Sequence, residues 1–203
     1  MNPDFNRRRL LATLAGVLVT TPSLAGSRLL ATPPQSAGPF YPLELPLDDD
    51  NDLTQVAGRD AVAAGRVTEL SGGVQDLDGR PIPDARIEIW QCDANGRYRH
   101  PGERGTALRD ENFQGYGHTV TDAAGRYRFR TIRPVPYPGR TPHIHMAVFA
   151  PQSTPLVTQL YVRGEPRNAA DFLFNLVPAE RRHLVQADFL AAELPDVELR
   201  ASF

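Results

Sequence analysis

Alternating apolar and polar residues mark the middle of the chain. Residues 85–92 change character at almost every step, which is typical of a strand with one buried face. Four further segments are short, apolar and rich in strand-forming residues, and we interpret them as strands: 62–70, 127–132, 143–150 and 156–162. In all, we expect at least six short strands, and these five segments are the ones that the pattern places.

Turn-forming residues separate these segments. Residues 76–81, 93–96 and 122–125 combine Asp with Gly, which favours tight turns between strands. The 19 Pro and 16 Gly are spread along the chain, and only 169–190 has helical stretches, interrupted by Pro178. We therefore expect an all-β fold: a single antiparallel β-sandwich over residues 61–203, with an N-terminal arm and a little C-terminal helix. Residues 26–60, Pro-rich and then acidic, would form the extended arm.

Residues 1–25 have the features of an export signal. Arg7, Arg8 and Arg9 precede an uncharged apolar run at 10–21, and small residues lead to Ala25. The paired arginines indicate the twin-arginine route, so we expect an exported protein, periplasmic or extracellular. An amphipathic N-terminal helix or a lipid-facing anchor would also fit. The run is shorter than the roughly 20 residues that span a bilayer, however, so we expect no stable membrane anchor.

Composition excludes several kinds of chemistry. All 22 basic residues in the 203-residue chain are arginine, so neither a lysine Schiff base nor a P-loop can form. The net charge of −2 provides no basic field, and nucleic acid is not an expected partner. The single cysteine, Cys92, allows no internal disulfide and no cysteine-based zinc site.

Two histidines and two tyrosines are the strongest candidates for chemistry. On a strand, His143 and His145 would point to the same face and could reach one ion. Tyr137 lies between two prolines, which fix the backbone that presents it, and Tyr98 follows the turn at 93–96. Taken singly, each also fits an ordinary surface histidine or half-buried tyrosine. Together, phenolates beside imidazoles suit trivalent iron better than zinc.

Several segments resemble the intradiol ring-cleavage dioxygenases, and most closely their protocatechuate 3,4-dioxygenase-type subunits. The segments that carry the resemblance are residues 79–85, 89–98, 125–134, 136–138 and 140–145. The similarity extends from about Gly38 to Tyr161, and the ordered Tyr, Tyr, His-x-His set is its most specific part. It implies a β-sandwich that holds non-haem Fe(III). It also implies that O₂ cleaves a catechol-type ring between its two hydroxylated carbons, giving a cis,cis-muconate-type diacid.

By the same resemblance, the metal ligands would be Tyr98, Tyr137, His143 and His145. Tyr98 would remain bound throughout, whereas Tyr137 would be displaced when the substrate chelates. Arg140, three residues before His143, would lie beside the bound ring and stabilise negative charge as it develops there.

Three further positions match residues that support the site in this family. Gln159 matches a glutamine that orients the arginine and a histidine. Gly38 and Pro39 belong to a segment that lines the substrate pocket in the family, and an ordinary Pro/Gly turn fits them equally well. The chain departs from the family between Tyr137 and Arg140, where only Pro-Gly intervenes and the usual tryptophan is missing. The identity of the catechol therefore stays open.

Two other classes of protein remain open. A non-catalytic binding module of the transthyretin-like or carboxypeptidase-appended type shares the Asp-x-Asp-Gly-x-Pro-Ile-x-x-Ala pattern of residues 76–85, but it does not require the later histidines. A zinc hydrolase could use His143, His145 and a water, but no nearby Glu supplies the usual third ligand or base. Members of the dioxygenase family range from dimers to larger assemblies, so a homo-oligomer is compatible with the resemblance.

Overall fold

The computed structural model describes residues 28–46, 48–189 and 196–200, and this part of the chain is rich in β-structure. Its strands form two sheets, and the prediction of a β-rich fold is confirmed. The predicted export signal, residues 1–25, lies outside the described residues and stays a prediction. No helix in the described part of the chain is long and apolar enough to cross a membrane.

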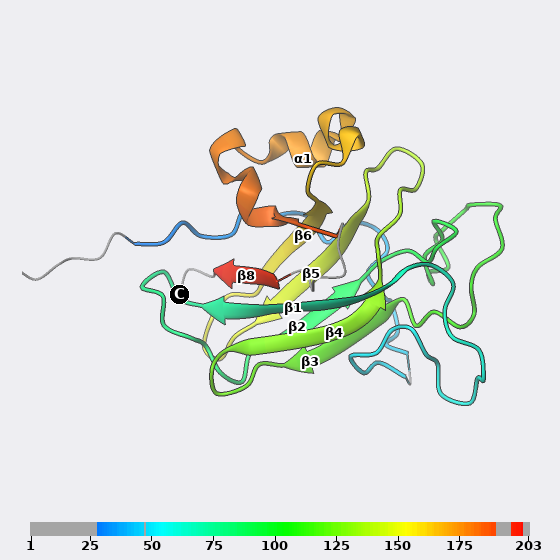
Figure 1. Ribbon diagram of the computed structural model, residues 1–203, viewed down its shortest axis with the longest axis horizontal. Helices are drawn as coiled ribbons and strands as arrows, with labels where there is room; N and C mark the ends of the chain where they lie inside the picture. Colours follow the sequence, from blue (N-terminus) through cyan, green and yellow to red (C-terminus); the bar gives the residue numbers. More distant parts are fainter. Residues whose placement is uncertain (1–27, 47, 190–195, 201–203) are drawn as a thin grey trace, which may run out of the picture.

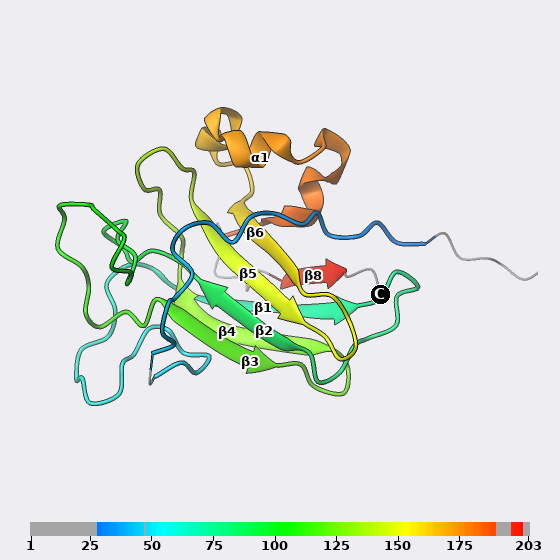
Figure 2. The same ribbon diagram turned by 180° about the vertical axis from the view of Figure 1, so that it is seen from behind.

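The strands lie in two layers. The five-stranded sheet has the order β3 (Tyr116–Val120), β2 (Arg86–Trp90), β5 (His143–Phe149), β6 (Leu156–Val162) and β7 (Gln186–Ala187). The three-stranded sheet has the order β4 (Arg126–Ile132), β1 (Val67–Gln75) and β8 (Asp196–Arg200). β1 and β4 cross in front of β2 and β5 in Figure 1, and behind them in the opposite view of Figure 2.

Two strand pairs depart from the antiparallel prediction. β8 runs parallel to β1, and β7 runs parallel to β6. A parallel neighbour needs a long connection. The connection between β6 and β7 contains three short helices: η1 (Pro166–Ala170), α1 (Phe172–Leu176) and η2 (Ala179–Val185). These helices lie together beside β6 at the top of Figure 1.

The first strand begins later than predicted. β1 covers residues 67–75 rather than 62–70, because Gly65 has a φ of 105° and interrupts the extended chain before it. Gly72 and Gly73, which resemble turn residues in the sequence, instead pair with Tyr127 and Arg126 of β4. The strand therefore extends through the two glycines. The hydrophobic pattern does not show this part of the strand, because glycine has no side chain.

Alternation along β2 divides its side chains between the core and a second face. Ile87 and Ile89 are fully buried in a cluster that also contains residues of β1, β4, β5 and β6, so this cluster fills the space between the sheets. Trp90 points to the opposite face. The strand register aligns Trp90 with His145 of β5, and His145 with Gln159 of β6. The outer face of the sheet therefore presents an aromatic and polar row.

The N-terminal segment covers this outer face. Its backbone bonds to β6, where Gln35 N donates to Val157 O at 2.8 Å. Farther along, the Tyr41 hydroxyl donates to Glu88 Oε2 of β2 at 2.8 Å. In Figure 2 the segment is the blue ribbon that crosses in front of β6. The row on the outer face is thus enclosed between the sheet and the arm.

Candidate metal centre

His143 and His145 project from the outer face of β5 and are each only 1% exposed. Their Nε2 atoms are 3.1 Å apart, so the two-residue spacing brings both imidazoles to one point. His143 Nδ1 lies 2.7 Å from Thr141 O, and it donates there because a carbonyl oxygen can only accept. The proton is thereby placed on Nδ1, which leaves a lone pair on Nε2.

Burial keeps both imidazoles neutral. It lowers the pKa of His143 to about 4, and the positive charge of Arg140 acts in the same direction. Burial also lowers the pKa of His145 well below its usual value, again with help from His143 and Arg140. At neutral pH the two rings therefore offer nitrogen lone pairs, the form that binds a metal.

Tyr98 reaches the histidines from the loop that follows β2. Asp93 shapes this loop, because its Oδ1 accepts hydrogen bonds from Asn95 N at 2.8 Å and from Arg97 N at 2.9 Å. The centroid of the Tyr98 ring is 6.2 Å from that of His145. Its hydroxyl is buried and has no hydrogen-bond partner among the described residues. Burial raises the pKa of Tyr98 well above its usual value, so a phenolate here needs a cation beside it.

Tyr137 opens a tight turn that also carries Arg140. Arg140 N donates to Tyr137 O at 2.9 Å, and Gly139 between them has a φ of 81°. A Pro followed by a glycine of positive φ is the sequence of a type II turn, so the short loop is a favourable structure. The Tyr137 ring lies 5.4 Å from the Tyr98 ring and 5.5 Å from the His143 ring, centroid to centroid.

The predicted ligands thus converge as one donor set: Tyr98, Tyr137, His143 and His145. Two donors are imidazole nitrogens with free lone pairs, and two are phenols whose burial raises their pKa. In the described part of the chain, no group of three or more His, Cys, Asp and Glu side chains could hold a metal. The site therefore differs from an ordinary zinc site, and its phenol oxygens suit a harder, more highly charged ion.

Arg140 and Gln159 lie at the edge of the donor set. Arg140 Nη1 donates to the Tyr137 hydroxyl at 3.3 Å, and Nη2 donates to Gln159 Oε1 at 2.6 Å. Gln159 Nε2 donates in turn to Ser36 O of the arm at 2.9 Å. The guanidinium is therefore held between the turn, the sheet and the arm.

The two arm residues predicted to line the substrate pocket differ in their placement. Gly38 has a φ of 70°, and a Cβ atom there would lie 3.3 Å from His145 Cε1 and 3.8 Å from its Nε2. Glycine thus lets the arm approach the histidine closely. Pro39 is exposed and lines neither of the cavities that flank the donor set.

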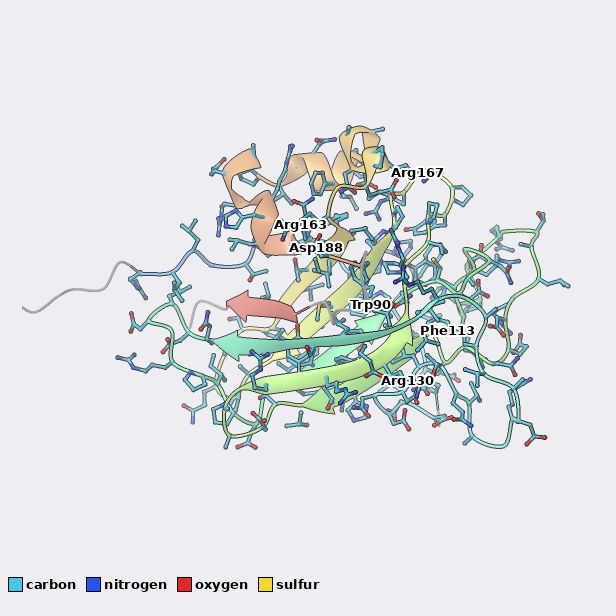
Figure 3. All side chains as sticks on the ribbon, viewed as in Figure 1. Trp90, Phe113, Arg130, Arg163, Arg167 and Asp188 are labelled. Atoms are coloured by element: carbon cyan, nitrogen blue, oxygen red, sulfur yellow. The ribbon has the colours of Figure 1, made fainter. Side chains whose placement is uncertain are left out.

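Two cavities flank the donor set. One, of about 290 Å³, is bordered by Tyr137, Arg140 and Arg167. The other, of about 320 Å³, lies on the side of Tyr98 and Trp90. Figure 3 labels Arg167 and Trp90, and both lie toward the end of the sheets where the long loops gather. These volumes are near the lower end for small-molecule sites, which is sufficient for a single aromatic ring.

Three residues of the site are missing from the sequence prediction: Phe40, Trp90 and Asp171. Trp90 stacks on His145 at 4.9 Å with the rings 5° apart, and Phe40 stacks on Tyr98 at 4.7 Å. The signal for Trp90 is its position in 85–92, where a large aromatic occupies the polar phase of an alternating strand. Asp171 has no comparable local signal, because its partner Arg140 is 31 positions away.

Comparison with known sequences gives consistent relatives. A family model described as Dioxygenase matches residues 37–202. The protocatechuate 3,4-dioxygenase beta chain of Burkholderia cepacia is 40% identical, over 66% of this chain and 60% of its own length. The alpha chain from the same organism is 35% identical, over 76% of this chain and 81% of its own. Hydroxyquinol 1,2-dioxygenase of Corynebacterium glutamicum is 35% identical, but this chain covers only 46% of it.

Solved structures share the fold. The dioxygenase domain of a dioxygenase carbohydrate-binding protein fusion from Streptomyces sp. SirexAA-E has 29% identity and a TM-score of 0.63, covering 85% of this chain and 97% of that one. Catechol 1,2-dioxygenase from Acinetobacter sp. ADP1 has 25% identity and a TM-score of 0.61, covering 85% and 62%. The matched region contains all four donors of the metal centre. The chain therefore belongs to the intradiol ring-cleavage dioxygenase family.

Proposed function

We propose that this chain is a non-haem Fe(III) dioxygenase. It cleaves a catechol-type ring between the two hydroxylated carbons, incorporates both atoms of O₂ and yields a cis,cis-muconate-type diacid. The observation that carries the proposal is the convergence of two tyrosines and two histidines at one buried point, where His143 Nε2 and His145 Nε2 are 3.1 Å apart.

Four residues hold the metal in this proposal: Tyr98, Tyr137, His143 and His145. When bound, the ion supplies Lewis acidity toward the two oxygens of a chelating catechol and makes the ring reactive toward O₂. The protein supplies orientation and exclusion of water. Thr141 O fixes the tautomer of His143, and the stacked rings of Trp90 and Phe40 shield His145 and Tyr98.

Tyr137 and Arg140 act on the protons and charge of the substrate. Both border the cavity of about 290 Å³, so a ring bound there contacts them. A Tyr137 phenolate at the border of this cavity would accept a proton from a substrate hydroxyl. Arg140 is always cationic and its side chain is only 10% exposed, so its charge is weakly screened and stabilises negative charge developing on the ring.

The substrate belongs to the catechols in this proposal. The relatives are named for protocatechuate, hydroxyquinol and catechol. Such compounds share the adjacent hydroxyls that chelation requires. This chain spans 60% and 46% of two of these curated relatives, so the activity of a complete enzyme is part of the proposal. A homo-oligomer is proposed as well, as an expectation from the family resemblance. The protocatechuate relatives are described as alpha and beta chains, which supports assembly in general but not its composition.

Two alternative functions fit the site less well. A non-catalytic binding module gives no reason for a buried, unpartnered phenol beside two neutral imidazoles. A zinc hydrolase needs a further histidine, cysteine or carboxylate ligand, and the described residues offer no group of three.

Two finer features complete the proposal. The first is a β-sandwich domain over residues 61–203, with 26–60 as its arm and a little C-terminal helix; the two sheets with a common hydrophobic core support it. Residues 1–25 act as a twin-arginine export signal, so that the enzyme works in the periplasm or outside the cell.

Metal analysis with visible absorption spectroscopy tests the function. Protein produced with iron should contain about one iron per chain and show a strong visible band from phenolate-to-Fe(III) charge transfer. Colourless protein that has a full complement of zinc, or an iron-loaded protein without the band, would contradict the proposal.

A further inference from the structure

A buried carboxylate outside the predicted site lies next to Arg140. Asp171 sits between η1 and α1, and its side chain has no exposed surface. Arg167, labelled in Figure 3, marks this helical segment, which lies beside β6 in Figure 1. Asp171 and Arg140 both border the cavity of about 290 Å³ beside Tyr137. The residue therefore borders the cavity, while its carboxylate lies behind the cavity surface.

One carboxylate joins the turn before β5 to the helical segment that contains α1. Asp171 Oδ2 accepts hydrogen bonds from Arg140 Nε at 2.8 Å and from Thr141 N at 2.9 Å. Its Oδ1 accepts from Phe174 N at 2.9 Å and caps α1. Burial alone would raise the pKa of Asp171, but the hydrogen bonds to its two oxygens lower it overall. A carboxylate this deeply buried is stable only when it is paired and hydrogen-bonded. The groups that donate to it are therefore held in fixed positions.

Asp171 fixes the direction in which the guanidinium points. With Nε bound to Asp171 and Nη2 bound to Gln159, Arg140 Nη1 faces the Tyr137 hydroxyl at 3.3 Å. A free arginine side chain samples many rotamers, and this freedom is lost when the side chain is ordered. The two contacts supply that ordering in advance, so the charge is in place before the substrate arrives.

Asp171 also reaches His143 through a single residue. It binds Thr141 N from one side, and Thr141 Oγ1 donates to Asn168 Oδ1 at 2.7 Å on the other. Thr141 O then accepts the Nδ1 proton of His143 at 2.7 Å. An outer partner of this kind sets the tautomer and the ring orientation of a metal-binding histidine.

We propose that Asp171 is the positioning residue of this site: it holds Arg140 against the cavity and holds the Thr141 carbonyl that orients His143. This inference rests on the proposed function, since ring cleavage is the reaction in which Arg140 stabilises charge. Asp171 itself does not touch the substrate, and its effect passes through Arg140 and His143.

Asp171→Ser and Asp171→Asn test the proposal in the iron-loaded full chain. Serine is a favourable N-cap residue and still caps α1, but it leaves Arg140 Nε without a carboxylate. Glu165→Gln is the matched control. Glu165 caps η1 by accepting a hydrogen bond from Arg167 N at 3.2 Å, and it does not line the cavity beside Tyr137.

Anaerobic titration with catechol followed by an oxygen pulse separates substrate binding from the later steps. We expect both Asp171 variants to retain iron and to shift the visible band, because His143 reorients. Their reaction with O₂ should slow by about 10–100-fold. Combined with Arg140→Ala, they should lose clearly less than the product of the two single losses, because only the part of the effect that passes through His143 remains to be lost. Glu165→Gln should match the parent in every measurement.

Parental spectra and rates in the Asp171 variants would overturn the proposal, and so would losses that multiply fully with Arg140→Ala. If neither variant folds, the carboxylate serves the fold rather than the arginine, and the proposal is overturned as well. Failure of the proposed function has a different signature, because the parent protein itself would then bind no iron or leave catechol intact.

Discussion

Burial sets the protonation of each donor residue in the metal centre. Tyr98 is 3% exposed and its hydroxyl has no partner among the described residues, while burial keeps His143 and His145 neutral. A buried hydroxyl without a hydrogen bond costs about 1–3 kcal/mol. The four side chains therefore do not satisfy each other's hydrogen-bonding groups, and a bound cation would stabilise them. Metal binding should for this reason raise the free energy of unfolding.

Removal of a ligand should abolish the metal centre. We expect Tyr98→Phe and His145→Ala each to weaken iron binding and to lose the visible band. The loss in affinity should exceed the roughly 10–100-fold that is typical when a residue hydrogen-bonded to a metal ligand is removed. Tyr137→Phe should be milder, because substrate displaces this ligand in the proposed reaction. Metal analysis and absorption spectra measure both effects. Tyr98 or His145 variants that keep full iron and full ring cleavage would disprove the ligand assignment.

Arg140 should matter more for the reaction than for binding. Its charge acts on negative charge that develops during turnover, and loss of one such donor typically costs about 10²–10³ in rate. We expect Arg140→Ala to keep iron and colour and to bind catechol anaerobically, but to react with O₂ at least about 100-fold more slowly. An oxygen pulse after anaerobic loading measures the second step. A parental rate in that step would reduce Arg140 to a turn residue.

At the level of secondary-structure elements, one strand, one turn and the arm position the residues of the candidate metal centre. β5 supplies both histidines, the Pro-Gly turn supplies Tyr137 and Arg140, and the arm covers them. At Gly38 an added Cβ atom would lie only 3.3 Å from His145 Cε1. A side chain at that position has to move either the arm or the imidazole.

Gly38→Ala should therefore disturb the metal centre as well as the fold. A left-handed conformation costs an alanine about 1–2 kcal/mol, and the new Cβ atom presses on His145. Gly58→Ala is the matched control, since Gly58 has a similar φ of 78° but nothing within 4 Å of its Cβ position. Urea unfolding should show a comparable loss for both. Only Gly38→Ala should shift the visible band, and equal spectra for the two variants would contradict this account.

Elements with a clear pattern could be predicted from the sequence, and those shaped by distant contacts could not. The strand predicted at 156–162 coincides with β6, and that at 143–150 nearly coincides with β5. β3 is not predicted because it contains Gly117, which is not a strand-forming residue. Only glycine fits at this position, since a Cβ atom there would lie 2.3 Å from Asp50 O. The four donors could be predicted from their sequence motifs. The contact of Asp171 with Arg140 could not, because it depends on the folding of two segments that are far apart in the sequence.

At the scale of the whole molecule, the buried candidate metal centre would be combined with the predicted export signal. Twin-arginine export carries folded proteins, so the proposed iron insertion would precede transport.

Replacement of Arg7 and Arg8 by lysine should stop export by this route, because the pathway reads the arginine pair itself rather than its charge. In a bacterial host that has the pathway, the parent protein should be recovered with iron in the periplasm, and the variant should accumulate in the cytoplasm. Subcellular fractionation with metal analysis provides the measurement. Unchanged export of the variant would contradict the predicted signal.

Product analysis with isotopically labelled dioxygen tests the central claim most directly. The iron-loaded enzyme should convert catechol into cis,cis-muconate, and mass spectrometry should find label from O₂ at both new oxygen positions. This result follows from cleavage between the hydroxylated carbons with both oxygen atoms retained. An aldehyde-bearing product from cleavage beside them, or no ring opening by fully iron-loaded protein on any catechol, would contradict the account.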